Sequence, residues 1–131
     1  MGKTKINPIL CDTNILFNFL EGNELIRKSL KKIHKERIAF SVITHAEAYC
    51  GASKSEFAVL KTFFNNYITY HISEDSSKIF NGLIQSYYGQ RHSKWIPDAL
   101  IASIALSNNL ELYTLNRKDF DFIPGLKLYN P

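Results

Sequence analysis

The sequence has 131 residues, a length that suits one compact domain, so we expect residues 1–131 to form a single unit. Apolar residues make up 45% of the chain and charged residues 21%, which excludes a disordered chain and favours an ordinary globular protein. Lysine and arginine outnumber aspartate and glutamate by 16 to 12, and this mildly basic balance permits a polyanionic partner without requiring one.

The first half of the chain predicts two short strands among helices. Its expected elements are, in chain order, a strand at 8–11, helices at 15–20 and 25–33, a strand at 38–43 and helices at 45–51 and 53–64. The strand at 38–43 has a nearly continuous apolar run, as expected when both faces of a sheet are covered. Thr44 and Glu47 have the spacing of a capping box at the start of the helix that follows.

The second half continues the alternation. Its expected elements are a strand at 67–72, a helix at 74–88, a polar loop at 89–94, a helix from Pro97 to Ser107, a strand at 110–115, a turn at 116–120 and an edge strand at 126–129. Strands that alternate with helices predict an α/β domain with a mostly parallel sheet, in which ligands bind beyond the carboxyl ends of the strands.

The two cysteines, Cys11 and Cys50, are too few for a disulfide framework. Both lie among apolar residues, so we expect buried free thiols in a reducing compartment. Met1 to Pro8 is not followed by an apolar region of signal-peptide length, and no apolar run approaches the roughly 18 residues of a membrane span. These features predict a cytoplasmic protein with no membrane association.

Four acidic residues fall near the carboxyl ends of the expected strands or in first turns of helices, and they are Asp12, Glu47, Asp98 and Asp119. If the strands are parallel, these carboxylates converge at one edge of the sheet. Ionised carboxylates brought together raise one another's pKa, and a hard cation such as Mg²⁺ or Mn²⁺ removes that repulsion. A metal in such a cluster can generate hydroxide from water and stabilise charge on a phosphate.

Each acid also has a purely structural alternative. Asp12 can cap the helix that follows it, and Glu47 can be only the back half of a capping box. Asp98 can merely complement the dipole of its helix, and Asp119 can be a solvated turn residue. The argument for a shared site therefore comes from the common placement of the four residues relative to the strands.

Several short segments, taken in order, resemble the PIN-domain ribonucleases and especially the VapC-type toxins of prokaryotic toxin–antitoxin pairs. The matching segments are Leu10–Asn14, Ser41–Glu47, Pro97–Ala102, Tyr113–Phe120, and the closing Ile123–Leu126 and Asn130–Pro131. The resemblance implies a three-layer α/β/α sandwich with a central, mostly parallel sheet. It also implies an endoribonuclease that depends on Mg²⁺ or Mn²⁺.

The same resemblance assigns roles to residues of this chain. It maps the first three acids of the family onto Asp12, Glu47 and Asp98, and it leaves the fourth position open between Asp119 and Asn116. It implies that Thr13 or Asn14 supports the metal site, and that Thr114 and Asn116 shape the wall beside it. Toxins of this type form homodimers and are silenced by a cognate antitoxin protein, so both partners are expected here.

Other side chains suggest how RNA and an antitoxin are held. The basic and aromatic residues beside the acids can grip an RNA strand by charge and stacking, and they are Arg91, Lys94, Trp95, Arg117 and Lys118. Aromatic residues of the early helices can form either core or an antitoxin groove, and they are Phe17, Phe19, Phe57, Phe63 and Phe64. Two further readings stay open: a housekeeping PIN nuclease that processes RNA, and a PIN module that binds RNA or protein without cleaving it.

Overall fold

A five-stranded parallel sheet forms the centre of the structure, a computed structural model that describes residues 7–131. The first six residues, on which part of the signal-peptide prediction rests, lie outside the described part. The strands are β1 (Ile9–Cys11), β2 (Ile38–Ser41), β3 (Ile68–Tyr70), β4 (Glu111–Tyr113) and β5 (Lys127–Leu128). Their order across the sheet is β3-β2-β1-β4-β5, and each neighbouring pair is parallel.

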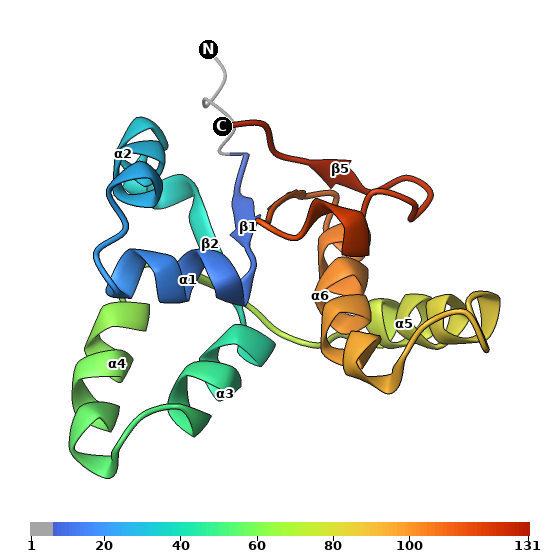
Figure 1. Ribbon diagram of the computed structural model, residues 1–131, viewed down its shortest axis with the longest axis horizontal. Helices are drawn as coiled ribbons and strands as arrows, with labels where there is room; N and C mark the ends of the chain where they lie inside the picture. The colour runs from blue at the N-terminus through green and yellow to red at the C-terminus, as the bar shows by residue number, and fades with distance from the viewer. Residues whose placement is uncertain (1–6) are drawn as a thin grey trace.

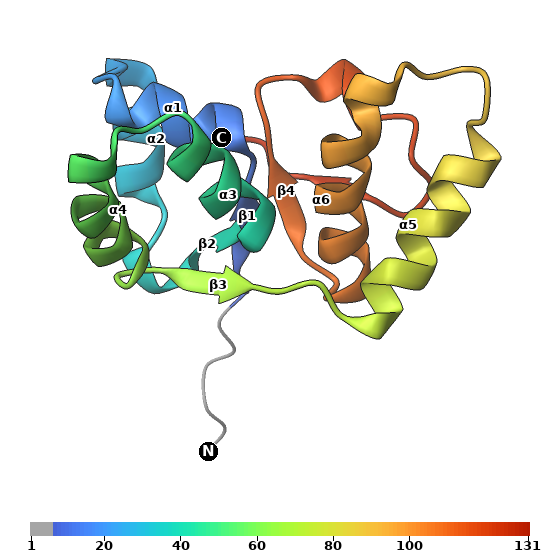
Figure 2. The same ribbon diagram turned by 90° about the horizontal axis from the view of Figure 1, so that it is seen from below.

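Helices cover both faces of this sheet. They are α1 (Thr13–Leu20), α2 (Glu24–Lys32), α3 (Val42–Cys50), α4 (Phe57–Phe64), α5 (Glu74–Ser86) and α6 (Ile96–Ser107). In both views α1 to α4 lie on one side of the strands and α5 and α6 on the other (Figures 1 and 2). The expected three-layer α/β/α sandwich is therefore confirmed.

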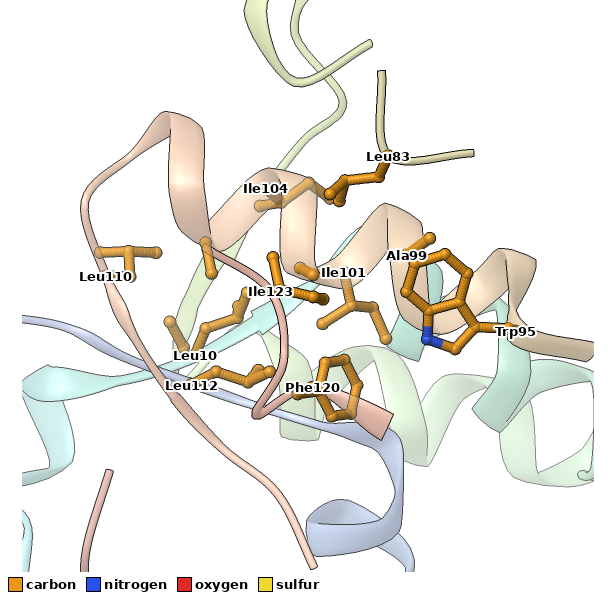
Figure 3. Packing of buried hydrophobic residues seen from close by; sticks show 13 residues of the cluster. Leu10, Leu83, Trp95, Ala99, Ile101, Ile104, Leu110, Leu112, Phe120 and Ile123 are labelled. Atoms are coloured by element: carbon orange, nitrogen blue, oxygen red, sulfur yellow. The ribbon is translucent and has the colours of Figure 1, made fainter. Parts of the chain in front are cut away.

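Alternating side chains of the strands supply a core to each layer. Leu10, Ala39 and Leu112 belong to the cluster that packs against α5 and α6, and Figure 3 shows Leu10 and Leu112 in this cluster with Ile101 and Phe120. Ile9 and Cys11, on either side of Leu10, belong to the cluster of α1 and α2. The alternation follows from the two-residue period of a strand, and burial on both faces explains the apolar runs in the sequence.

The elements expected from the sequence are all present, and one boundary differs in a way that matters for function. The strand β2 ends at Ser41, because the Ser41 Oγ accepts a hydrogen bond from the Thr44 backbone N–H and caps α3. Val42 and Ile43 are therefore helical, and the prediction that Thr44 is the cap is wrong. As a result Glu47 lies in the second turn of α3 rather than the first.

The cysteines divide between the interior and the surface. Cys11 is a buried free thiol, as expected, and burial followed by the nearby charge of Asp12 raises its pKa. Cys50 is exposed at the end of α3, so the prediction that it is buried is wrong. Among residues 7–131, no helix has the length and apolar character needed to cross a membrane.

The strand order places a change of direction between β1 and β4. The chain moves outward from β1 through β2 to β3, and then α5 and α6 carry it across the sheet to β4 on the other side of β1. Side chains that follow β1 and β4 therefore meet at the point where ligands bind in open parallel sheets.

The stability of this framework can be tested at the central strand. Leu112 is fully buried, so Leu112→Ala should lower the free energy of unfolding by about 3 kcal/mol, since it loses transfer energy and leaves a cavity. Leu25→Ala removes the same atoms from a residue that is 78% exposed, and its effect should stay within about 0.5 kcal/mol. Urea unfolding followed by circular dichroism measures both, and equal effects would contradict the packing described here.

Candidate active site

Asp12 is the best-ordered acid of the site. It follows β1, is only 4% exposed, and caps α1 by accepting a hydrogen bond from the Thr13 N–H at 2.8 Å. Its other oxygen accepts hydrogen bonds from the Thr114 hydroxyl, 2.8 Å away at the end of β4, and from the Asn14 amide at 3.2 Å. The capping role suggested by the sequence is thus present together with contacts that a simple cap does not need.

Thr114 and Asn14 form a small network around that carboxylate. The Thr114 Oγ1 accepts from the Asn116 N–H at 3.0 Å, and the Asn14 Oδ1 accepts from the Leu115 N–H at 3.2 Å. These bonds tie the segment after β4 to the start of α1. They fix the orientation of the Asp12 carboxylate, which a single cap would leave free to turn about its side-chain torsions.

Glu47 reaches the same region from α3 through a second hydroxyl pair. The Thr13 Oγ1 donates to the Glu47 Oε1 at 2.6 Å, and it lies 2.9 Å from the Thr44 Oγ1. Because Thr13 has one hydroxyl proton, its donation to Glu47 makes Thr44 the donor of the second bond. Thr44, which the sequence pattern predicts as a helix cap, instead lies fully buried within α3. From there its hydroxyl reaches Thr13 and joins the hydrogen-bond network of Thr13 and Glu47.

Asp98 lies in the first turn of α6, just after Pro97 at the start of the helix. Its pKa is raised to about 7, first by burial and then by the charges of Asp12, Asp119 and Glu47, in that order of effect. Burial also raises the pKa of Asp12, against the lowering effect of its hydrogen bonds, with smaller contributions from Glu47 and Asp119. The four predicted acids therefore influence one another across the carboxyl edge of the sheet.

Two residues, Asp119 and Asn116, are candidates for the fourth acidic position of the site. Asp119 ends the short helix η4 (Arg117–Asp119), and its charge acts on both Asp12 and Asp98. Asn116 is exposed, and its backbone N–H is what contacts the Thr114 hydroxyl. Asp119 is therefore the residue whose charge reaches Asp12 and Asp98, while the metal-binding role of all four acids stays a prediction.

A cavity of about 300 Å³ opens beside Asp98 and Asp119. Its other lining residues come from the loop before α6 and from η3 (Ser93–Trp95), and they are Gln90, Arg91, His92, Lys94 and Trp95. Arg91 forms an ion pair with Asp119 at 3.9 Å. Two of the predicted RNA-binding cations, Arg91 and Lys94, thus line one cavity with two of the acids.

The other three predicted RNA-binding residues are placed differently. Trp95 is only 6% exposed and its indole N–H donates to the Asp119 carbonyl oxygen at 2.9 Å, so most of its ring packs in the core (Figure 3) and its stacking on an RNA base stays a prediction. Arg117 donates to the Tyr129 carbonyl oxygen, and Lys118 is exposed. Neither lines the cavity. The sequence pattern missed Phe122, which contacts Arg91, because an aromatic residue in a loop gives no local signal of its partner.

The chemistry of the donor set fits a hard divalent cation. All four acids offer oxygen, and within residues 7–131 none of Asp12, Glu47 and Asp98 forms an ion pair with a lysine or arginine. In that part of the chain no three acidic, imidazole or thiol groups are close enough to form a preformed metal site. Glu47 accepts a hydrogen bond from the Thr13 hydroxyl, so a cation bound there would have to compete for one of its oxygens.

Comparison with known proteins shows which family and which relatives this chain resembles. The family model described as PIN domain matches residues 9–125. The chain is 29% identical over 120 residues to Ribonuclease VapC19 of Mycobacterium tuberculosis, covering 90% of this chain and 96% of that protein.

Chains in solved structures are similar to this chain in both sequence and fold. A toxin–antitoxin complex from Klebsiella pneumoniae contains a chain that is 31% identical, with a TM-score of 0.76 and coverage of 94% of this chain and 99% of that one. A chain in the structure of VapBC2 from Rickettsia felis, bound to a DNA fragment from its promoter, is 26% identical with a TM-score of 0.76, and coverage is 94% and 98%.

The crowding of carboxylates predicts that the site destabilises the metal-free chain. The pKa of Asp98 is raised from 3.8 to about 7, so the native state holds a proton that the unfolded state releases between those values, and stability falls as pH rises through this window. Asp98→Asn removes this dependence. Because the side chain is only partly buried, its stabilising effect above pH 7 should be only on the order of 1 kcal/mol.

Thermal unfolding in the presence of a chelator, between about pH 4 and pH 8, measures this effect. The difference in Tm between Asp98→Asn and the native chain should grow as pH rises and level off above about 7. Asp121→Asn, an exposed acid outside the cluster, is the matched control and should show no such trend. A constant difference across the pH range would argue against electrostatic coupling at Asp98.

Proposed function

The chain belongs to the PIN domain family, and from that premise we propose that it is a metal-dependent endoribonuclease acting as the toxin of a toxin–antitoxin pair. The observation that carries the proposal is the placement of Asp12 after β1 and Asp98 at the start of α6, where burial first and then the charges of Asp12, Asp119 and Glu47 raise the pKa of Asp98. A hard cation compensates such charge, and the similarity to Ribonuclease VapC19 supports RNA as the substrate.

In this proposal Asp12, Glu47, Asp98 and Asp119 hold Mg²⁺ or Mn²⁺. A metal bound there would supply activated water and stabilise charge on the phosphate being cleaved. Asp12 is the fixed ligand, because Thr13, Asn14 and Thr114 hold its carboxylate in one orientation. Glu47 and Asp119 are the adaptable ones, since each has a weaker competing partner, the Thr13 hydroxyl and Arg91.

The proposal includes an antitoxin, because the similar chains from Klebsiella pneumoniae and Rickettsia felis belong to toxin–antitoxin complexes. A groove of about 560 Å³ between α1, α2, β2 and α4 supports a docking place for it. The apolar floor includes Phe19, Phe40 and Phe63, and the rim carries Arg27, Lys31 and Lys35. An amphipathic segment with acidic residues fits this combination.

The five aromatic residues considered for such a groove divide between two roles. Phe19 and Phe63 line it, whereas Phe64 is 3% exposed and belongs to the core. Phe17 and Phe57 are 38% and 40% exposed and lie outside the groove lining. A homodimer acting in the cytoplasm completes the proposal, and sedimentation of the purified chain tests the dimer.

Cleavage of RNA tests the activity. The native chain should cut single-stranded RNA with Mn²⁺ or Mg²⁺ and not with a chelator. Asp12→Asn and Asp98→Asn should each lower the rate by at least about a hundredfold, because amide groups keep the shape and remove the charge that holds the metal. Asp75→Asn, an exposed acid on α5, should cleave like the native chain. Full activity of both site variants would refute the carboxylate mechanism.

Growth of a host cell tests the toxin role separately. Induction of the native chain alone should arrest growth, and Asp12→Asn at equal expression should not. Co-expression of the cognate antitoxin should restore growth, and substitution of Lys31 and Lys35 by glutamate in the groove rim should abolish that rescue. Harmless expression of a chain that cleaves RNA in vitro would instead indicate a housekeeping RNA-processing enzyme.

A further inference from the structure

Arg91 is held in one place by a platform of aromatic rings. The centre of its guanidinium lies 3.8 Å from the centroid of the Phe122 ring and 5.8 Å from that of Trp95. Tyr87 packs edge-on against both rings, with centroids 4.9 Å and 5.7 Å away, and its hydroxyl donates to the Phe122 carbonyl oxygen. The three rings therefore pack against one another and support the Arg91 guanidinium on one face, which lowers the entropy lost when the arginine meets a ligand.

The backbone brings Arg91 back over this platform. The helix α5 ends at Ser86, and Gly89 has a φ of +78°, a left-handed conformation that glycine adopts without strain. The Gln90 N–H donates to the Tyr87 carbonyl oxygen at 2.9 Å and closes the turn. The loop thus returns to the edge of the acid cluster within a few residues.

Most of the hydrogen-bonding capacity of Arg91 is unused by the protein. Its one polar contact within residues 7–131 is the ion pair with Asp119, at 3.9 Å, which is longer than a hydrogen bond. Both side chains are partly exposed, 32% for Arg91 and 41% for Asp119, so this pair is weak and exchangeable. The guanidinium also lines the cavity of about 300 Å³ beside Asp98.

We propose that Arg91 binds a phosphate of the RNA strand next to the one that is cleaved, and so positions the strand over the acid cluster. This inference rests on the proposed ribonuclease function. Four carboxylates repel a polyanion, and a fixed cation beside them offsets that repulsion. A planar guanidinium suits a phosphate because it can donate two parallel N–H bonds and is weakly hydrated. Lys94 lines the same cavity but is exposed and has no aromatic support.

The competing interpretation is that Arg91 only neutralises Asp119. The two interpretations differ in what they predict for RNA affinity and its dependence on salt. A residue that contacts phosphate contributes to the counterions released on binding, by about 0.7 in the slope of log affinity against log salt for a single strand. A residue that only pairs with Asp119 changes the affinity for metal and leaves that slope alone.

Binding is measured by fluorescence anisotropy of a short labelled single-stranded RNA, with every variant made in an Asp98→Asn background so that the RNA stays intact. Arg91→Gln should weaken binding about tenfold and lower the salt slope by about 0.7. Arg91→Lys should keep the slope and lose roughly threefold in affinity. An ammonium group retains the positive charge but lacks the two parallel N–H donors of a guanidinium. Arg37→Gln, which removes the same charge far from the cavity, should leave affinity and slope unchanged.

Steady-state cleavage by chains with Asp98 intact gives a second readout. Arg91→Gln should raise KM about tenfold and change kcat by less than about threefold, since the contact forms with the bound strand before and after cleavage. Native affinity and salt slope in Arg91→Gln, or equal losses in Arg37→Gln, would overturn the proposal. If no variant cleaves RNA but the binding contrast holds, the ribonuclease function fails while the assignment of Arg91 to RNA stands.

Discussion

Burying the carboxylate of Asp12 between the ends of two parallel strands is the constraint on which the rest of the site depends. An ionised carboxylate removed from water is costly unless several donors surround it. Here the Thr13 N–H, the Thr114 hydroxyl and the Asn14 amide provide those donors, one from the start of α1, one from the end of β4 and one from the first turn of the helix. The same bonds join β1, α1 and β4, so the carboxylate is held by the fold and also helps to define its edge.

Around this fixed point the other acids are less constrained. Glu47 comes from α3, Asp98 from α6 and Asp119 from η4, so each reaches the site on a different element. Burial and, after it, the charges of these acids raise the pKa of Asp98, and a strongly perturbed carboxyl group is typical of functional sites. The chain as a whole is positively charged, but the acid cluster is negative and would repel a polyanionic substrate. Cations beside the cluster offset this repulsion, and Arg91 and Lys94 line the cavity next to Asp98 and Asp119.

The helix α1 connects the two functional surfaces of the molecule. Its first turn carries Thr13 and Asn14, which hold the acids, while Phe19 in its last turn lines the apolar groove with the basic rim. Thr13 and Phe19 are six residues apart in this helix, so the two surfaces lie only about 9 Å apart along its axis. A partner seated in the groove would therefore contact the same short element that positions the metal-binding side chains.

The sequence by itself determined the α/β class, the order of the elements, the layered fold, and the positions of Asp12 directly after a strand and of Asp98 in the first turn of a helix. These features are local, because strand periodicity, helix starts and ordered motifs are written in neighbouring residues. Only the tertiary structure decided that Ser41 rather than Thr44 caps α3, that Trp95 is buried, and that Cys50 is exposed. The tertiary structure also decided that the charge of Asp119 acts on Asp12 and Asp98, and that the Phe122 ring packs against Arg91. These outcomes depend on contacts between residues far apart in the chain, and no local pattern records such contacts.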